Sequence, residues 1–232
     1  AEGLLSLQRG LERQFGVTVT TKACDLTRAE SVDEMLQIID KHNIKFDMHL
    51  NIAGIDFEGG FMERAREKVV GIVALNNAAT LRITHAILER RRADRPFTIV
   101  FVSSLASMFP MPLKATYAAS KRFLLDFATS LRQELKDQNV NVLALCPGGM
   151  VTTPEAMQGI TAQGIWGSIT TNALEVVAYK TLERALAGKG TYVPGLINQV
   201  LCFLGRIIPR SWVATVVHWR WKSAQSKWLT NM

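Results

Sequence analysis

The sequence predicts an α/β protein built on a doubly wound parallel sheet, a three-layer sandwich with helices on both faces. Apolar runs of strand length alternate with amphipathic helical stretches along the chain. These runs are continuously apolar, which is typical of parallel strands buried on both faces. With 232 residues, 48% of them hydrophobic, the chain is large enough to bury one full core.

The first elements are read from local signals. Apolar residues recur at helical spacing over residues 1–15, and Gly16 is a plausible C-cap for that helix. The alternating residues 17–20 then predict a strand. Ser31 and Glu34 have the spacing of a capping box, so a second helix is predicted to begin there.

The rest of the chain repeats the alternation of strand and helix up to about Gly195. Each predicted strand is a short apolar run, and each predicted helix carries apolar residues at three- and four-residue steps. In order, the segments are a strand at 46–52, a helix at 64–91, a strand at 97–102, a helix at 117–136, a strand at 140–145, a helix at 172–187 and a strand at 191–193. We therefore predict one domain over 1–195 with a helical C-terminal extension over 196–232.

Composition argues against several classes of protein. The chain has no uninterrupted run of about 18 apolar residues, and its first residues lack the pattern of a signal peptide. Cys24, Cys146 and Cys202 form no C-x-x-C pair, and the histidines are scattered. We therefore expect no metal site and reduced thiols in a cytoplasmic protein. The net charge of +7 is concentrated near the C-terminus, so nucleic-acid binding is not predicted.

The C-terminal extension combines large apolar residues with cations and contains no acidic residue from Leu196 to Met232. This composition suits a helix that lies on a membrane surface, and it suits a lid over the site or a dimer contact equally. The sequence leaves these roles open. The cations are Arg206, Arg210, Arg220, Lys222 and Lys227, and the tryptophans are Trp212, Trp219, Trp221 and Trp228.

Tyr117 and Lys121 form the most informative pair in the sequence. They stand four residues apart on a predicted helix, so both side chains lie on one face. An ammonium beside a phenol lowers the pKa of the phenol towards working pH, as an acid/base catalyst requires. Tyr117 could then exchange a proton with a substrate oxygen. Ser104 follows the strand at 97–102, at the edge of the sheet where its hydroxyl could hold that oxygen.

Two further motifs follow predicted strands at the same edge of the sheet. Asn51-Ile52-Ala53-Gly54 follows the strand at 46–52, and Cys146-Pro147-Gly148-Gly149 follows the strand at 140–145. A lone Y-x-x-x-K motif usually lies on an exposed helix and is weak evidence of catalysis by itself. Because doubly wound folds bind ligands at the carboxyl ends of their strands, the joint set predicts a ligand site.

These motifs resemble those of the classical short-chain dehydrogenases/reductases, over nearly the whole chain up to about Gly195. Residues 51–54 are similar to the N-N-A-G motif of that family, with Ile52 in place of its second Asn. Pro147-Gly148 with Thr152 is similar to its P-G-x-x-x-T segment. Asn76 sits where the family carries a fourth catalytic residue. Asn77 is the competing assignment, although Asn76 keeps the usual spacing to Thr84.

The resemblance implies a Rossmann-type fold and an NAD(P)-dependent enzyme that interconverts a carbonyl and an alcohol. Tyr117 would be the general acid in reduction, and Lys121 would lower its pKa and bond the nicotinamide ribose. Ser104 would orient the carbonyl, and Asn76 would support a proton-relay water. The implied cofactor is NADP or NAD, with NADP favoured, and the implied contacts are Asp25 at the adenine, Thr152 at the nicotinamide amide, and Leu26, Asn51, Ala53, Gly54, Tyr117, Lys121, Pro147 and Gly148.

The family also begins with a segment that this sequence does not contain. Its first strand leads into a T-G-x-x-x-G-I-G turn, whose glycines let the backbone approach the cofactor phosphates at a helix N-terminus. The helix that opens at Ala1 corresponds to a later element. We therefore expect roughly forty residues to precede Ala1.

Soft apolar residues in two loops flank Tyr117 in sequence and, by the resemblance, would wall the substrate pocket. They favour a small apolar ketone or alcohol, such as a steroid, acyl or terpenoid-like compound, while core or subunit contact is the alternative. The family likeness further implies a homodimer or homotetramer. The rival function is an idle scaffold, against which the joint presence of the four catalytic residues argues. The loop residues are Met108, Phe109, Met111, Met150, Met157, Ile160, Ile165 and Trp166.

Overall fold

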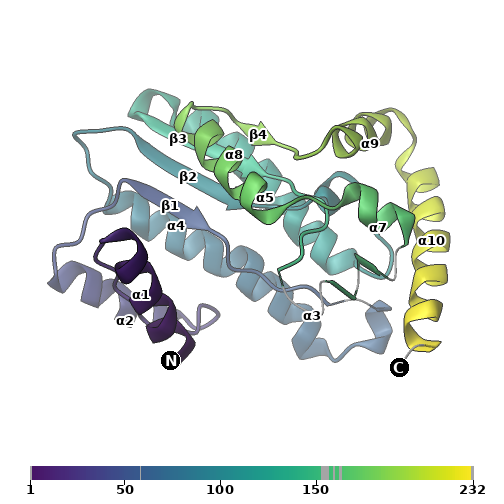
Figure 1. The fold of residues 1–232 in the computed structure, drawn as a ribbon, viewed down its shortest axis with the longest axis horizontal. Coiled ribbons are helices and arrows are strands. Elements are labelled where there is room, and N and C mark those ends of the chain that lie inside the picture. The colour runs from purple at the N-terminus through teal and green to yellow at the C-terminus, as the bar shows by residue number, and fades with distance from the viewer. Residues whose placement is uncertain (1, 58, 153–156, 159, 162–163, 231–232) are drawn as a thin grey trace. The chain divides into compact units, whose positions relative to one another are not determined.

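The computed structural model describes residues 2–57, 59–152, 157–158, 160–161 and 164–230 (Figure 1). The chain divides into two compact units, Ala1–Ile44 and Lys45–Met232. The second unit contains the parallel sheet and most of the predicted site residues.

The first unit contains two described helices, α1 at Glu2–Phe15 and α2 at Ala29–Lys41. Gly16 ends α1 as predicted, with a φ of 63° that suits glycine. The predicted capping box is wrong, because α2 begins before Ser31. The Ser31 hydroxyl instead accepts a hydrogen bond from the backbone N–H of Asp25 at 3.1 Å.

The predicted strand at 17–20 is also wrong. A strand needs a hydrogen-bonded neighbour, and the described residues of the first unit include no other strand. Side chains of α1 hold the segment instead. The backbone N–H of Val19 donates to the carboxylate of Glu12 at 3.0 Å, and the hydroxyl of Thr21 donates to the amide oxygen of Gln8 at 3.1 Å.

Four parallel strands form the sheet of the second unit, in the order β1-β2-β3-β4. The prediction of a parallel α/β sheet is confirmed. In the register of the strands, Val100 pairs with both Leu50 and Leu143. The bounds are Met48–Asn51 for β1, Phe97–Val102 for β2, Val140–Leu145 for β3 and Thr191–Tyr192 for β4.

Helices follow the strands as the alternation predicts. The main ones are α3 at Arg66–Val73, α4 at Thr80–Glu89, α5 at Ala115–Glu134, α7 at Ile165–Thr170 and α8 at Leu174–Leu186. The tail forms α9 at Leu196–Ile207 and α10 at Arg210–Thr230. Shorter helical segments are η1 at Phe61–Glu63, η2 at Ala74–Ala79, η3 at Leu105–Met108 and η4 at Lys136–Gln138.

Helices cover both faces of the sheet. Neighbouring residues of a strand point to opposite faces. Val100 belongs to a buried cluster with Val177 and Ala185 of α8, which lies on the viewer's side of the strands in Figure 1. Phe101 packs instead edge-to-face on Phe127 of α5, with ring centroids 5.5 Å apart. Burial on both faces explains why β2 is apolar at every position except Thr98.

A π-helical segment, η2, interrupts the long helix that the sequence predicts over 64–91. α3 runs into η2 and η2 into α4 without a break. Single π-turns inside α-helices often mark functional sites. This segment carries Asn76 and Asn77, both buried.

We expect His49 on β1 to make the fold sensitive to acid. Burial lowers its pKa from 6.5 to about 4, so the folded protein disfavours the charged ring. The stability present above pH 6.5 is therefore lost as pH falls from 6.5 towards 4, with a loss of about 2 kcal/mol expected at pH 5. Urea unfolding at pH 7.5 and pH 5 tests this, and His49→Gln should remove most of the difference. An equal loss in that variant would assign the acid sensitivity to other groups.

Candidate active site

The predicted site residues of the second unit gather at the carboxyl ends of β1, β2 and β3. β1 ends at Asn51, β2 ends just before Ser103 and Ser104, and β3 ends just before Cys146. The backbone N–H of Leu105 donates to the carbonyl of Pro147 at 2.7 Å, which joins the loops after β2 and β3. The topology alone therefore brings three distant motifs together.

Lys121 is buried, with only 5% of its surface exposed. Its ammonium donates to the carbonyl of Val102 at 2.8 Å, and its own carbonyl accepts from the Ser103 hydroxyl at 2.7 Å. Burial lowers the pKa of Lys121 to about 8, while Asp56 and Cys146 act in the opposite direction. The side chain is thus held at the end of β2, and its pKa of about 8 lies close to neutral pH.

Tyr117 lies near two ammonium groups. The Nζ atoms of Lys114 and Lys121 each lie 5.7 Å from its ring centroid. Burial nevertheless raises the pKa of Tyr117, Asp56 raises it further, and a hydrogen bond with Ser104 and the charge of Lys114 lower it only in part. The pKa of Tyr117 is thus raised where the sequence predicts a lowered one, because desolvation outweighs the lowering by Ser104 and Lys114.

Ser104 adjoins Tyr117 through that side-chain hydrogen bond. Its hydroxyl oxygen also accepts from the backbone N–H of Ala106 at 3.1 Å, at the start of η3. Because the oxygen accepts this bond, the Ser104 proton is available for donation to the Tyr117 oxygen or to a substrate oxygen.

Asn76 is fully buried and connects α5 to the loop after β1. Its amide oxygen accepts from the backbone N–H of Ile55 at 2.9 Å, and its amide nitrogen donates to the carbonyl of Ile55 and the hydroxyl of Ser120, both at 3.0 Å. The amide nitrogen of Asn77 donates to the carbonyl of Ser120 at 2.9 Å. Of the two candidate asparagines, Asn76 is thus the one tied to the Ala53-Gly54 loop.

Gly54 allows two of these side chains to approach the backbone closely. A Cβ atom at this position would lie 3.1 Å from the Lys121 ammonium and 3.2 Å from the Asn76 amide oxygen. Ala53 beside it is exposed, and Asn51 is buried, with its amide oxygen accepting from the hydroxyl of Thr80 at 3.3 Å. The loop therefore offers an open backbone cradle next to Lys121.

The Pro147-Gly148 turn packs closely against the end of α7 and against α9. A Cβ on Gly148 would overlap the carbonyl of Thr170, and it would lie 2.8 Å from the amide nitrogen of Asn198. Asn198 is fully buried and donates to the carbonyls of Pro194 and Thr170 at 2.8 and 3.2 Å. Thr152 beyond the turn is exposed.

Asp25 and Leu26 lie in the first unit. The Asp25 carboxylate is exposed and accepts from the hydroxyl and the backbone N–H of Thr27 at 2.7 and 3.0 Å, and these bonds lower its pKa. Leu26 is half-buried. Their role at the adenine stays a prediction.

An ion pair that sequence reasoning missed stands beside Tyr117. The Lys114 ammonium lies 2.6 Å from a carboxylate oxygen of Asp56. Both residues act on the pKa of Tyr117, in opposite directions. Asp56 stands two positions after the N-x-A-G motif, and Lys114 lies far from it in sequence. Only the topology of the sheet brings the two side chains together, so no sequence pattern predicts their contact.

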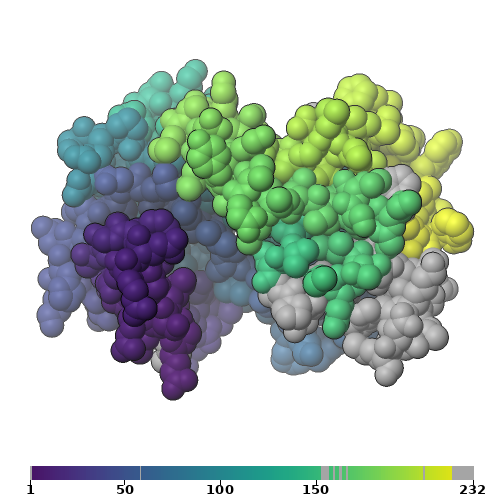
Figure 2. All heavy atoms as spheres, in the orientation of Figure 1, coloured from purple at the N-terminus to yellow at the C-terminus, as the bar shows by residue number. Residues whose placement is uncertain are grey.

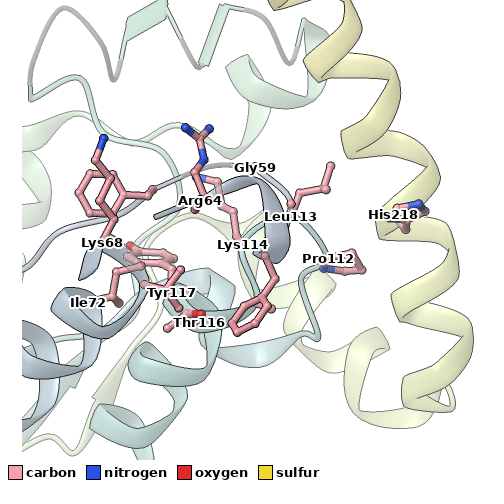
Figure 3. A pocket seen from close by; sticks show the side chains of 15 residues that line it. Gly59, Arg64, Lys68, Ile72, Pro112, Leu113, Lys114, Thr116, Tyr117 and His218 are labelled. Carbon is pink, nitrogen blue, oxygen red and sulfur yellow. The ribbon is translucent and has the colours of Figure 1, made fainter. Parts of the chain in front are cut away.

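A cavity of about 160 Å³ opens beside Tyr117 (Figure 3). Phe57, Phe61 and Leu113 are among its apolar walls, and His218 reaches it from α10. The backbone N–H of Gly59 donates to the carbonyl of Leu113 at 2.9 Å and so ties two walls together. Leu113 has a φ of 67°, a strained value for such a residue that often marks functional sites.

None of the eight loop residues predicted to wall the pocket is among the described residues that line this cavity, although Pro112 and Leu113, which follow Met111 in the first of the two loops, do line it. Met150 packs against the core cluster under α8, and Phe109 lies against Gly205 of α9. Met157 and Ile165 are exposed, and the Trp166 side chain lies outside the described part of the structure. For Met150 and Phe109, the alternative of ordinary packing is the correct one.

Comparison with known proteins identifies the setting of these residues. The family model described as short chain dehydrogenase matches residues 1–162. A very-long-chain 3-oxoacyl-CoA reductase of Laccaria bicolor is 28% identical over 144 residues, which are 60% of this chain and 42% of that protein. A 3-oxoacyl-[acyl-carrier-protein] reductase, MabA of Mycobacterium avium, is 23% identical over 75% of this chain and 64% of its own length. The chain spans less than half the length of the first four curated relatives.

Solved structures show the same fold. A structure of 7β-hydroxysteroid dehydrogenase superposes with a TM-score of 0.83 at 16% identity, covering 94% of this chain and 83% of the other. L-sorbose reductase from Gluconobacter frateurii, complexed with NADPH and L-sorbose, superposes with a TM-score of 0.71 at 22% identity, over 84% and 82%. A 4-hydroxyisoleucine dehydrogenase complexed with NADH also matches, with a TM-score of 0.64 at 17% identity over 81% of each chain.

Proposed function

The chain belongs to the short-chain dehydrogenase/reductase family, and we propose that it interconverts a carbonyl and an alcohol with a nicotinamide cofactor. The observation that carries this proposal is the convergence of Ser104, Tyr117 and Lys121 at the end of β2. Tyr117 forms a hydrogen bond with Ser104. The Lys121 ammonium lies 5.7 Å from the centroid of the Tyr117 ring and donates to the carbonyl of Val102. A phenol, a hydroxyl and an ammonium so placed are suited to proton transfer at one substrate oxygen.

In reduction, Tyr117 donates its proton to the carbonyl oxygen. Because the pKa of Tyr117 is raised above its ordinary value, the phenol is protonated at neutral pH and is available as the proton donor. Ser104 donates a hydrogen bond, without losing its proton, to the same oxygen and so orients the carbonyl. Lys121 stabilises the phenolate that remains. The nicotinamide, when bound, supplies the hydride, and the reverse reaction uses the same groups in the opposite sense.

The residues around Lys121 fit the ribose of such a cofactor. Gly54 exposes backbone within reach of the Lys121 ammonium, and a side chain there would fill the space. We propose that Lys121 and the Ala53-Gly54 backbone hold the ribose. Asn76 has both amide hydrogens and its amide oxygen engaged by Ile55 and Ser120, so it acts by positioning the loop at Gly54.

An apolar substrate is supported by the walls of the cavity beside Tyr117. Phe57, Phe61, Val69, Ile72 and Leu113 all line it. Relatives are named for 3-oxoacyl groups, and a structural neighbour is named for a hydroxysteroid. NADP is the favoured cofactor, with NAD as the alternative, since neighbours were solved with either. A homodimer or homotetramer in the cytoplasm stays a prediction.

A screen of cofactor oxidation tests the proposed function. Full-length protein containing this chain is mixed with NADPH or NADH and a panel of ketones that includes a 3-oxoacyl thioester, a ketosteroid and L-sorbose. Loss of absorbance at 340 nm with at least one ketone is expected. Cofactor binding without oxidation by any ketone or reduction by any alcohol would favour the scaffold alternative.

The pH dependence of the reaction should report Lys121. Its pKa of about 8 means that the ammonium is intact below pH 8 and is lost as pH rises above it. Since the Tyr117 phenol stays protonated over that range, kcat/KM for reduction should be level below pH 8 and fall above it. A profile measured from pH 6 to 10 with a non-ionising ketone checks this. A level profile to pH 10 would contradict the role of the ammonium.

A further inference from the structure

Two helices of the tail expose apolar stripes. Leu196, Val200, Phe203 and Ile207 recur at helical steps on α9, and Trp212, Val216 and Trp219 do so on α10. All seven are exposed, from 50% for Val200 to 77% for Trp219. We call these seven residues the apolar tail surface. Figure 2 shows atoms of α9 at the surface, at the upper right.

The contacts of α9 explain why its stripe is exposed. Asn198 and Cys202, one turn apart, form its buried side. Asn198 bonds the carbonyls of Pro194 and Thr170, and Gly205, on the same side, lies against Phe109. The helix is therefore fixed to the site by a narrow polar and small-residue face, which leaves its larger apolar residues outward. Single exposed apolar side chains are ordinary, whereas stripes on successive helices mark an interaction surface.

The charge of the tail selects the partner. From Leu196 to Met232 there are five Lys and Arg and no Asp or Glu. A two-fold contact between two such tails would bring like charges together without a carboxylate in either tail to pair them. Anionic lipid headgroups supply the missing negative charge, and tryptophan is enriched at membrane–water interfaces. No described helix is both long and apolar enough to cross a membrane, which agrees with a helix that lies on the surface.

We propose that the apolar tail surface binds the face of an anionic bilayer. α10 also contributes His218 to the lining of the cavity that contains Tyr117 (Figure 3). Trp219, the next residue, belongs to the apolar tail surface. Membrane binding through these residues therefore brings the cavity next to lipid, which suits a substrate dissolved in the bilayer; this last step rests on the proposed function.

Co-sedimentation with vesicles tests the binding directly. Full-length protein is mixed with phosphatidylcholine vesicles or with vesicles of phosphatidylcholine and phosphatidylglycerol at 3:1. Binding is expected only with the anionic vesicles, and raising the salt from 0.1 M to 0.5 M should weaken it about tenfold. Equal binding to both vesicles, or none to either, would overturn the proposal.

A matched pair of double variants separates the surface from the rest of the chain. Trp212→Glu with Trp219→Glu should lower vesicle binding at least about tenfold, because both side chains leave the interface and the added charge is repelled. Tyr179→Glu with Leu186→Glu on α8 makes the same charge change at residues exposed by 71% and 63%. The α8 variant should retain most of its binding. An equal loss in both variants would mean that net charge alone decides, against the proposal.

Two other readouts distinguish the competing occupants of the surface. Sedimentation velocity of the Trp212→Glu, Trp219→Glu variant, called the α10 variant, tests for a dimer contact. If this variant alone became monomeric while its vesicle binding was unchanged, the surface would be a dimer contact and the proposal would be overturned. With an active ketone, the α10 variant should lose turnover of a vesicle-embedded substrate and keep turnover of a water-soluble one. Loss of both would assign these residues to a lid. Vesicle binding needs no catalysis, so it can succeed even where the proposed function fails.

Discussion

Replacing Tyr117 with phenylalanine is expected to lower kcat for carbonyl reduction by at least about 100-fold, the usual contribution of a general acid. The ring stays, so the packing beside Lys114 and Lys121 is kept, and only the proton and its bond with Ser104 are removed. Cofactor affinity should change little. Steady-state rates with NADPH and a ketone, together with a fluorescence titration of the cofactor, measure both quantities.

Tyr179→Phe is the matched control for this variant. Tyr179 is exposed on α8 and does not line the cavity. The activity of the Tyr179→Phe variant should therefore equal that of the unaltered protein. If Tyr117→Phe keeps more than about a tenth of kcat, the proton comes from another group. Asp56 and Lys114, which flank Tyr117, would then be the next groups to replace.

Lys121→Met should damage turnover and cofactor binding together. Methionine keeps the length of the side chain but removes the ammonium that bonds Val102 and faces the Gly54 backbone. We expect kcat/KM to fall about 100-fold and the cofactor Kd to rise about tenfold, since one charge serves two tasks. Thermal unfolding should show no loss of stability, because the buried charge costs desolvation energy in the folded protein.

Lys180→Met on α8 provides the control, because Lys180 is exposed. Its kinetics and cofactor affinity should be unchanged. If Lys121→Met binds cofactor normally, the proposed ribose contact is wrong, although a role beside Tyr117 could still account for lost turnover. If turnover also stays normal, neither role survives.

The sheet could be predicted well because its signal is strong and local. The bounds of β2 and β3 agree with the predicted 97–102 and 140–145, since strands buried on both faces are apolar at nearly every position. The strand at 17–20 was predicted from alternation alone, and alternation says nothing about whether a neighbour is there to pair with it. Helix ends were less exact, as for α5, which begins at Ala115 rather than Tyr117.

The candidate site could be predicted in its motifs but not in its electrostatics. Ser104, Tyr117 and Lys121 gather because the ends of parallel strands do, and the sequence shows which residues follow each strand. The net shift of the Tyr117 pKa depends on burial and on Asp56, which are properties of the assembled fold. Asn198 carried no motif at all, and only the packing of α9 reveals its bonds to the Thr170 segment.

The π-helical segment η2 also sets the rotational phase of the helix on each side of it. A π-turn accommodates an extra residue, and one residue rotates an α-helix by about 100°. Asn76 and Asn77 can therefore face Ser120 on α5, while Thr80 and Thr84 beyond them face Asn51 and His49 on β1. Adding or deleting a residue between Ala74 and Ala79 would turn one of these two sets away from its partners. We therefore expect a one-residue insertion or deletion in this stretch to disrupt the fold more than a substitution does, even where the residue added or removed is an alanine.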